Sequence, residues 1–207
     1  MNRPSNDEGH LIAVEPADTV MARLRAQAPS PPQAAAILDT SNILTPMNIT
    51  LINPPPFAIV EPWYDRPDFG RAGLAYLAGY LRQDSDFDVR ICDAKLERLD
   101  FEAVVRRVVA DRPDVVGLTA FTNEITPAAY MAALIKHELP NCVTVIGGVH
   151  VTALPAKTLE QFPSFDIGVV GEGEITFSEL CRSLRDGDSL GDTPGLIYRT
   201  GGEILSS

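Results

Sequence analysis

Two short glycine-bearing segments carry residue types that suit the binding of a flat or elongated ligand. One is Gly147-Gly148-Val149-His150, and the other is Gly171-Glu172-Gly173-Glu174. Glycine has no side chain, so a bulky ligand can lie directly against the backbone there. The two glutamates can accept hydrogen bonds from amide or hydroxyl groups. A tight turn would also explain the glycine pair, and the helix dipole would also favour Glu174 at a helix start. Two such segments at neighbouring strand ends favour ligand binding.

The loops after the other predicted strands lack the signatures of several common sites. After the first strand the chain reads Asn53-Pro54-Pro55-Pro56, so prolines without N–H donors replace the glycine-rich turn of a dinucleotide site. Neither a P-loop nor a G-x-S-x-G nucleophile elbow occurs. A phospho-acceptor domain needs acids where Asn53 and Thr119 stand. No paired acid and base supports a small-molecule enzyme at these strand ends.

The elements that position these loops follow from hydrophobic spacing. Leu74, Leu77, Ala78 and Leu81 recur at the interval of one helical face. The predicted strands are 49–53, 88–92, 114–118, 142–146 and 166–170, and the predicted helices are 73–81, 101–109, 128–139, 156–162 and 175–184. This alternation predicts an α/β, Rossmann-like (flavodoxin-like) doubly wound five-stranded parallel sheet. A short C-terminal hairpin is expected around Thr200-Gly201-Gly202. Ligands of such sheets bind beyond the carboxyl ends of the strands.

The first 47 residues differ in character from the remainder. They are rich in proline and contain one predicted helix, over about residues 18–28. We expect residues 1–47 to form a partly disordered extension and residues 48–207 to form the folded domain. A loose tail is the favoured interpretation, and a docking segment for a partner is the alternative.

Composition excludes several classes of partner. The net charge is −11 and no dense run of Lys and Arg occurs, so neither nucleic acid nor an anionic membrane is an expected partner. Apolar stretches fall far short of the roughly 18 residues of a membrane helix. The N-terminus does not read as a secretory signal, so the expected location is cytoplasmic. The three cysteines have no metal-ligand spacing, and we expect them to be buried apolar residues.

The order of the segments resembles a known family. The series LINPPP, GLAYLAGYL, VRICDA, PDVVGLTAFT, VIGGVHVTALP, FDIGVVGEGEITFSEL and GLIYR is similar to the N-terminal cobalamin-binding domain of cobalamin-dependent radical S-adenosylmethionine enzymes. That group includes methyltransferases and the anaerobic magnesium-protoporphyrin monomethyl ester cyclases. The resemblance spans residues 48–205 and does not extend to the first 47 residues.

The resemblance implies a cofactor, cobalamin, and a set of residues that contact it. Gly147-Gly148 matches the glycine pair along which the nucleotide tail of the cofactor lies. Thr119 stands where broader cobalamin-binding domains have a serine whose hydroxyl faces the dimethylbenzimidazole, although Phe121 departs from the usual leucine. The implied cofactor-binding residues are Asn53, Pro54, Pro55, Thr119, Ala120, Phe121, Thr122, Gly147, Gly148, His150, Gly171, Glu172, Gly173 and Glu174.

Two departures from the wider families limit what the resemblance implies. Mutases and methionine synthase have an Asp-x-His-x-x-Gly motif whose histidine binds cobalt, but Pro67 takes that place in residues 65–70. We therefore expect no protein histidine on cobalt, and we expect His150 to hydrogen-bond to the ligand or to support the strand end. The radical enzymes also carry Cys-x-x-x-Cys-x-x-Cys for a [4Fe–4S] cluster. This motif is absent from the sequence, so no iron–sulfur cluster is expected in this chain.

The sequence therefore favours a cobalamin-binding module that is not catalytic alone. Because it ends at Ser207, where the radical domain of the relatives would begin, we expect a truncated chain or a stand-alone subunit. Its expected partners are cobalamin and a radical S-adenosylmethionine catalytic subunit or a missing domain, which would carry out methyl transfer or radical chemistry. The alternative is a degenerate domain that has lost cobalamin and acts in protein interaction or regulation.

Overall fold

The structure is a computed structural model, and it describes residues 45–57 and 69–207. The helix predicted over residues 18–28 and the Pro67 position lie outside these residues. The described elements are β1 (Met47–Asn53), α2 (Ala72–Leu81), β2 (Phe87–Asp93), α3 (Ala94–Glu97), α4 (Phe101–Asp111), β3 (Val115–Thr119), η3 (Thr122–Glu124), α5 (Ile125–Glu138), β4 (Val143–Gly147), α6 (Val149–Ala153), α7 (Pro155–Gln161), β5 (Ile167–Val169), α8 (Gly173–Asp186), η4 (Leu190–Asp192), β6 (Leu196–Thr200) and β7 (Glu203–Ser206).

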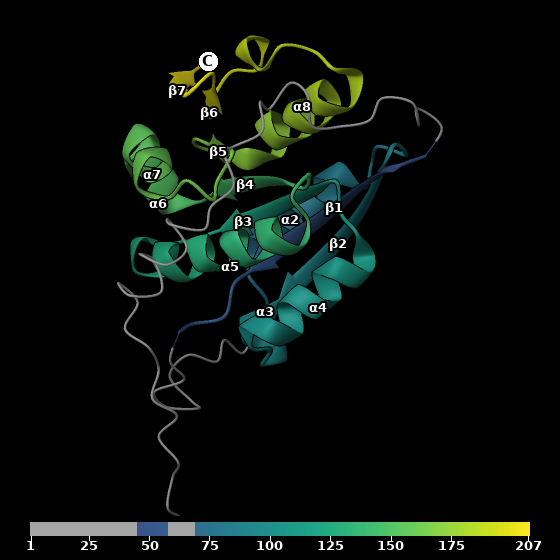
Figure 1. The fold of residues 1–207 in the computed structure, drawn as a ribbon. Coiled ribbons are helices and arrows are strands. Elements are labelled where there is room, and N and C mark those ends of the chain that lie inside the picture. The colour runs from purple at the N-terminus through teal and green to yellow at the C-terminus, as the bar shows by residue number, and fades with distance from the viewer. Residues whose placement is uncertain (1–44, 58–68) are drawn as a thin grey trace, which may run out of the picture.

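The strands form a single sheet in the order β2-β1-β3-β4-β5-β6-β7. The pairs among the first five strands are parallel, and β6 and β7 continue the sheet in antiparallel pairing. The α/β fold with five parallel strands and a C-terminal hairpin is thus confirmed. The hairpin extends the sheet beyond β5, opposite the β2 edge (Figure 1). The chain adds β2 on one side of β1 and then adds β3 on the other side, so the strand order switches direction between β1 and β3. In flavodoxin-like sheets, a crevice that can bind a ligand opens at this switch point.

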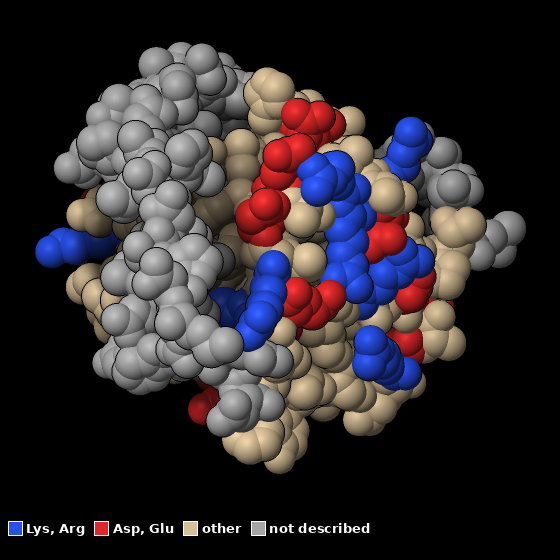
Figure 2. Space-filling view, turned by 90° about the horizontal axis from the view of Figure 1, so that it is seen from below, with Lys and Arg blue, Asp and Glu red and all other residues tan. Residues whose placement is uncertain are grey.

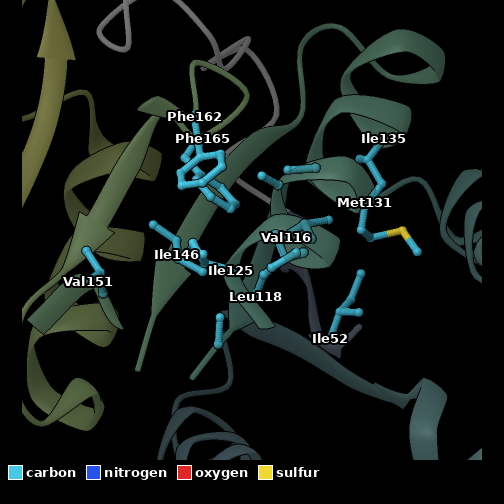
Figure 3. Close-up of a cluster of buried hydrophobic side chains, with 14 of the residues drawn as sticks. Ile52, Val116, Leu118, Ile125, Met131, Ile135, Ile146, Val151, Phe162 and Phe165 are labelled. Carbon is cyan, nitrogen blue, oxygen red and sulfur yellow. The ribbon is translucent and has the colours of Figure 1, made fainter. Parts of the chain in front are cut away.

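Successive side chains of the central strands point to opposite faces of the sheet, and they contribute to two apolar layers, one on each face. On one face, Val116 and Leu118 of β3 pack with Met131 of α5, and Figure 3 shows these side chains beside Ile146 of β4. On the other face, Leu51 of β1 packs with residues of α2 and α8 in a second cluster. Helices therefore cover both faces, as the apolar strand pattern predicts.

Two short helices differ from the sequence-based expectation. Residues 94–97 form α3, capped by Asp93, whose carboxylate accepts a hydrogen bond from the backbone N–H of Leu96 at 3.2 Å. Residues 149–153 form α6 directly after Gly148, so His150 lies on a helix rather than in an extended strand-end loop. Helices of four and five residues are too short to show a 3.6-residue period. The helix predicted at 128–139 begins earlier, at Ile125.

Candidate functional site

A cavity of about 160 Å³ lies between the sheet and helices α2 and α8, at the carboxyl ends of β3, β4 and β5. Its walls are side chains from three strands and both helices, namely Leu51, Leu74, Leu77, Val145, Val169 and Phe177. Five of the six are no more than 5% exposed, and Leu77 is half-buried. The rim is formed by the glycine-bearing segments at 147–148 and 171–174. A dry cavity of similar size can accept an aromatic ring.

Gly147 and Gly148 serve different purposes at this rim. A Cβ on Gly147 would find its nearest atom, the Leu118 carbonyl oxygen, 3.8 Å away, so the space beside this residue is open. Gly148 has φ +99°, and a Cβ there would lie 2.9 Å from the carbonyl oxygen of Ala120. A side chain at Gly148 would therefore collide with the neighbouring loop. Gly147 leaves room for a ligand, whereas Gly148 allows the close approach of two loops.

Thr152 of α6 joins the two glycine-bearing segments. Its hydroxyl donates to the carbonyl oxygen of Gly148 at 3.0 Å and accepts from the backbone N–H of Gly171, also at 3.0 Å. Gly171 has φ +84°, which favours glycine there. α8 begins at Gly173, so the first backbone N–H groups of this 14-residue helix lie at the rim with Glu172 and Glu174. The expectation that the two segments are neighbours is correct.

Gly117 is a cavity residue that the sequence interpretation missed. It lies inside β3, where a Cβ would meet Leu51 at 2.9 Å and the ring of Phe177 at 3.1 Å. Its lack of a side chain lets the ring of Phe177 pack directly on the strand. A glycine inside a strand often marks such close approach, and this signal could have identified it.

A buried ionic cluster ties together the loops that follow β1, β2 and β3. Both carboxylate oxygens of Glu124 accept hydrogen bonds from the guanidinium of Arg71, at 2.9 and 2.8 Å. One of these oxygens also accepts a hydrogen bond from the ammonium of Lys95 at 2.7 Å. The other accepts the backbone N–H of Phe121 at 2.9 Å. The guanidinium of Arg71 lies 4.6 Å from the centre of the Phe121 ring. Arg71 directly precedes α2, so the cluster fixes one wall of the cavity relative to the β3 loop.

The electrostatic state of Glu124 follows from these contacts. Burial acts to raise the pKa of the Glu124 carboxyl. The hydrogen bonds from Lys95 and from the Phe121 N–H, with the charge of Arg71, outweigh burial and lower the pKa below its ordinary value. The carboxylate is therefore ionised at neutral pH. A second buried pair continues the cluster, because the side-chain amide of Asn53 donates to Asp93 at 2.8 Å.

His150 lies close to this region but does not line the cavity. Its backbone N–H donates to the carbonyl oxygen of Ala120 at 3.3 Å, and its side chain is buried. Burial lowers the pKa of His150, so the ring is neutral at pH 7. Within the described part of the chain, its Nδ1 is buried without a hydrogen-bond partner. Buried polar atoms are nearly always paired, so this nitrogen is an exception in the fold.

The structure gathers about half of the residues that the sequence suggests for the cofactor. Thr119, Gly147, Gly148 and the segment 171–174 line the cavity. The other seven residues lie near the strand ends but outside the cavity lining. Asn53 and Phe121 lie in or beside the ionic cluster, and Pro54 and Pro55 are buried directly after β1. Ala120 and His150 form the contact between the β3 loop and α6, and Thr122 lies in η3. Contact of any of these residues with a ligand stays a prediction.

Other features of the described residues bear on metals, membranes and nucleic acids. All three cysteines are buried, and burial raises the pKa of each thiol. For Cys142 the pKa rises to about 12. No group of three or more potential metal-ligating side chains is found in the part of the chain that the structure describes. None of the described helices has the length and apolar content needed to cross a membrane. On the face shown in Figure 2, several basic side chains lie in a stripe that acidic side chains flank and interrupt.

Comparison with known proteins identifies relatives of this fold and sequence. A family model described as "B12 binding domain" matches residues 66–181, which is more than half of the chain. The uncharacterized methyltransferase PH0819 of Pyrococcus horikoshii is 39% identical over 132 residues, covering 64% of this chain and 28% of that protein. The anaerobic magnesium-protoporphyrin IX monomethyl ester cyclase of Rubrivivax gelatinosus is 36% identical over 121 residues, covering 58% of this chain and 22% of that protein.

Solved structures agree at the level of the fold. The radical S-adenosylmethionine methyltransferase TsrM from Kitasatospora setae, solved with cobalamin and a [4Fe-4S] cluster, superposes with a TM-score of 0.65 at 22% identity, covering 78% of this chain and 29% of that one. The cobalamin-dependent radical enzyme OxsB gives 0.66 at 22% identity, covering 80% of this chain and 22% of that one. The chain spans between a fifth and a third of the length of the curated relatives that it matches.

Proposed function

Because the chain belongs to the family of B12-binding domains, we propose that it is a cobalamin-binding module whose ligand site lies at the carboxyl ends of β3, β4 and β5. The observation that carries this proposal is the cavity between the sheet and helices α2 and α8, with a glycine-bearing rim on one side and buried apolar walls below it. The family resemblance seen in the sequence is confirmed, and the cavity supports a specific place for the cofactor.

The residues present fit a corrinoid with a nucleotide tail. The open space beside Gly147 would receive part of the tail, because no side chain fills it. The hydroxyl of Thr119 lies at the cavity and could hydrogen-bond to a ring nitrogen of the base. The N–H groups at the start of α8 favour an anionic or carbonyl group of the ligand. His150 does not line the cavity, so a hydrogen bond from its buried Nδ1 to the ligand would need the ligand to extend beyond the cavity.

The chemistry would come from the cofactor together with a second catalytic unit. When bound, cobalamin supplies a cobalt centre that can carry a methyl group. The role of this chain would be to bind and orient the cofactor, and to shield the nucleotide tail from water. Methyl transfer or radical chemistry would be carried out by a radical S-adenosylmethionine domain or subunit that also holds the iron–sulfur cluster. We expect no histidine of this chain to bind cobalt.

Equilibrium dialysis tests the proposal directly. The full chain is dialysed against hydroxocobalamin or methylcobalamin at about 100 µM, and the corrinoid retained is measured by its absorbance. A specific site with a micromolar dissociation constant, roughly −8 kcal/mol, would be nearly saturated under these conditions. Retention close to one equivalent supports the proposal. No retention above that of a protein without such a domain would reject it.

A second candidate function is a degenerate domain that binds a protein in place of cobalamin. The observation in its favour is a group of exposed apolar side chains near the cavity mouth and along α2, with Phe69 82%, Tyr76 74% and Ile175 61% exposed. Large exposed apolar residues often mark contact surfaces. The same surface would also suit the catalytic unit of the first proposal. The dialysis experiment separates the two, because only the first requires corrinoid retention.

A further inference from the structure

The chemical character of the cavity walls bears on which corrinoids the site accepts. Building on the proposed function, we propose that the cavity selects corrinoids whose lower base is apolar and methylated, such as 5,6-dimethylbenzimidazole, over those with a purine base such as adenine. The selectivity would come from the walls of the cavity and not from the corrin ring, which both kinds of corrinoid share.

The walls offer apolar contact from several directions. Leu51, Val145 and Val169 contribute from the sheet, and each is no more than 3% exposed. Leu74 of α2 and Phe177 of α8 face the same space from the helices, at 5% and 3% exposed. These side chains belong to one apolar cluster, so any group that enters is surrounded by hydrocarbon and by one aromatic ring. Methyl groups on a planar base gain from such surroundings.

Polar partners for a buried base are few. The hydroxyl of Thr119 is the polar side-chain group that lines the cavity away from the two glutamates of the rim, and it forms no hydrogen bond with any residue that the structure describes. The described buried polar side-chain atoms without a hydrogen-bond partner belong to Asn53, Lys136, His150 and Arg199, and none of these residues lines the cavity. Of these atoms, Lys136 Nζ forms an ion pair with Asp166. Glu172 is exposed and Glu174 half-buried at the rim.

The two kinds of base differ in how many polar atoms must be satisfied. A dimethylbenzimidazole joined to its ribose has one free ring nitrogen, which Thr119 alone can satisfy by donating a hydrogen bond. An adenine has an exocyclic amine and three free ring nitrogens, and most of these would lose water without gaining a partner. Burying an unpaired polar group is unfavourable, so the purine should bind more weakly.

A ligand series on the unmodified chain tests the inference. Dissociation constants are measured by isothermal titration for cobalamin, for the adenine-containing analogue and for cobinamide, which has no nucleotide. We expect cobalamin to bind at least 10-fold more tightly than the adenine analogue, which corresponds to about 1.4 kcal/mol, and cobinamide to bind more weakly than cobalamin. Equal affinity for the two bases would overturn the inference and leave the proposed function intact. Equal affinity for all three would show that the base does not enter the cavity.

Failure of the proposed function has a different signature, because then none of the three corrinoids binds. A pair of variants locates the selectivity. Val145→Thr adds a hydroxyl to the cavity wall, whereas Val108→Thr makes the same change at a buried position of α4 on the other face of the sheet. We expect the preference for cobalamin to narrow at least 3-fold in Val145→Thr and to be unchanged in Val108→Thr. An unchanged preference in both folded variants would contradict the assignment to the cavity walls.

Discussion

Filling the space beside Gly147 tests whether the cavity holds the nucleotide tail. Gly147 closes β4 with a backbone conformation outside the positive-φ region, so the chain should accept another residue there. An added Cβ would lie 3.8 Å from its nearest neighbour, the Leu118 carbonyl oxygen, which is an ordinary contact distance. In Gly147→Phe the ring would therefore extend into the cavity of about 160 Å³ and occupy much of the space that the tail needs.

The expected loss of affinity follows from the buried area of the tail. An aromatic base of about the size of an indole ring buries roughly 150–250 Å², which at about 25 cal/mol per Å² contributes about 4–6 kcal/mol. Losing most of this contribution lowers the affinity for cobalamin on the order of 10³-fold. The fold should persist, because the new side chain meets open space and not backbone. We expect the thermal midpoint to stay within about 3 °C of the unmodified chain.

The assay is isothermal titration with hydroxocobalamin on folded protein, and Gly79→Phe is the matched control. Gly79 lies on α2, does not line the cavity, and has no atom within 4 Å of an added Cβ. The control should bind cobalamin as the unmodified chain does. If Gly147→Phe is folded and binds equally well, the tail does not use this cavity. If both variants lose binding to the same extent, the effect is not specific to the cavity.

Substitutions at three further positions test the parts that shape the site. Gly148→Ala should lower the free energy of unfolding by about 1–3 kcal/mol, measured by urea denaturation, because φ +99° and a 2.9 Å approach to Ala120 exclude a side chain; an unchanged stability would contradict this. Glu124→Gln should destabilise the fold by about 3 kcal/mol at pH 7, because Arg71 and Lys95 then lose their buried carboxylate partner. A free energy of unfolding equal to that of the unmodified chain would refute the role of the cluster. Because the folded-state pKa of Glu124 is lowered, its stabilising contribution is present above the ordinary value of 4.5 and is lost as the pH falls below that value; thermal melts in acid should show a smaller pH dependence in Glu124→Gln. In the cobalt(II) form of bound cobalamin, electron paramagnetic resonance should show the same spectrum for His150→Ala as for the unmodified chain, and a changed nitrogen splitting would indicate a histidine ligand.

The order of helices and strands could be predicted because each long element carries its own periodic signal. The spacing of Leu74, Leu77 and Leu81 identifies α2, and the β-branched run of 142–146 identifies β4. The α3 helix gives no such signal, although Asp93 is a typical N-cap residue that could have suggested it. The addition of the C-terminal hairpin to the same sheet depends on pairing between distant strands, which local patterns do not encode.

The candidate site also has one part that could be predicted from the sequence and one part that could not. The glycine-bearing rim could be predicted, because glycines at the ends of strands are visible in the sequence and the sheet brings those ends together. The walls could not, because Leu51, Val145 and Phe177 look like any other core residues until the packing of α2 and α8 leaves a space between them. The cluster around Glu124 was missed for a related reason, since Arg71 lies 53 residues away in the sequence. Gly148 illustrates the reverse, because a residue predicted to face the ligand also has a steric role in the fold.

The most direct test of the central claim is to locate bound cobalamin by nuclear magnetic resonance. Backbone amide signals of the full chain are followed as hydroxocobalamin is added in increments. We expect the largest changes at the cavity rim, at Thr119, Gly147 and Gly173, with little change along the outer face of α4. Changes concentrated on α4 or on the C-terminal hairpin, with the rim unaffected, would contradict it.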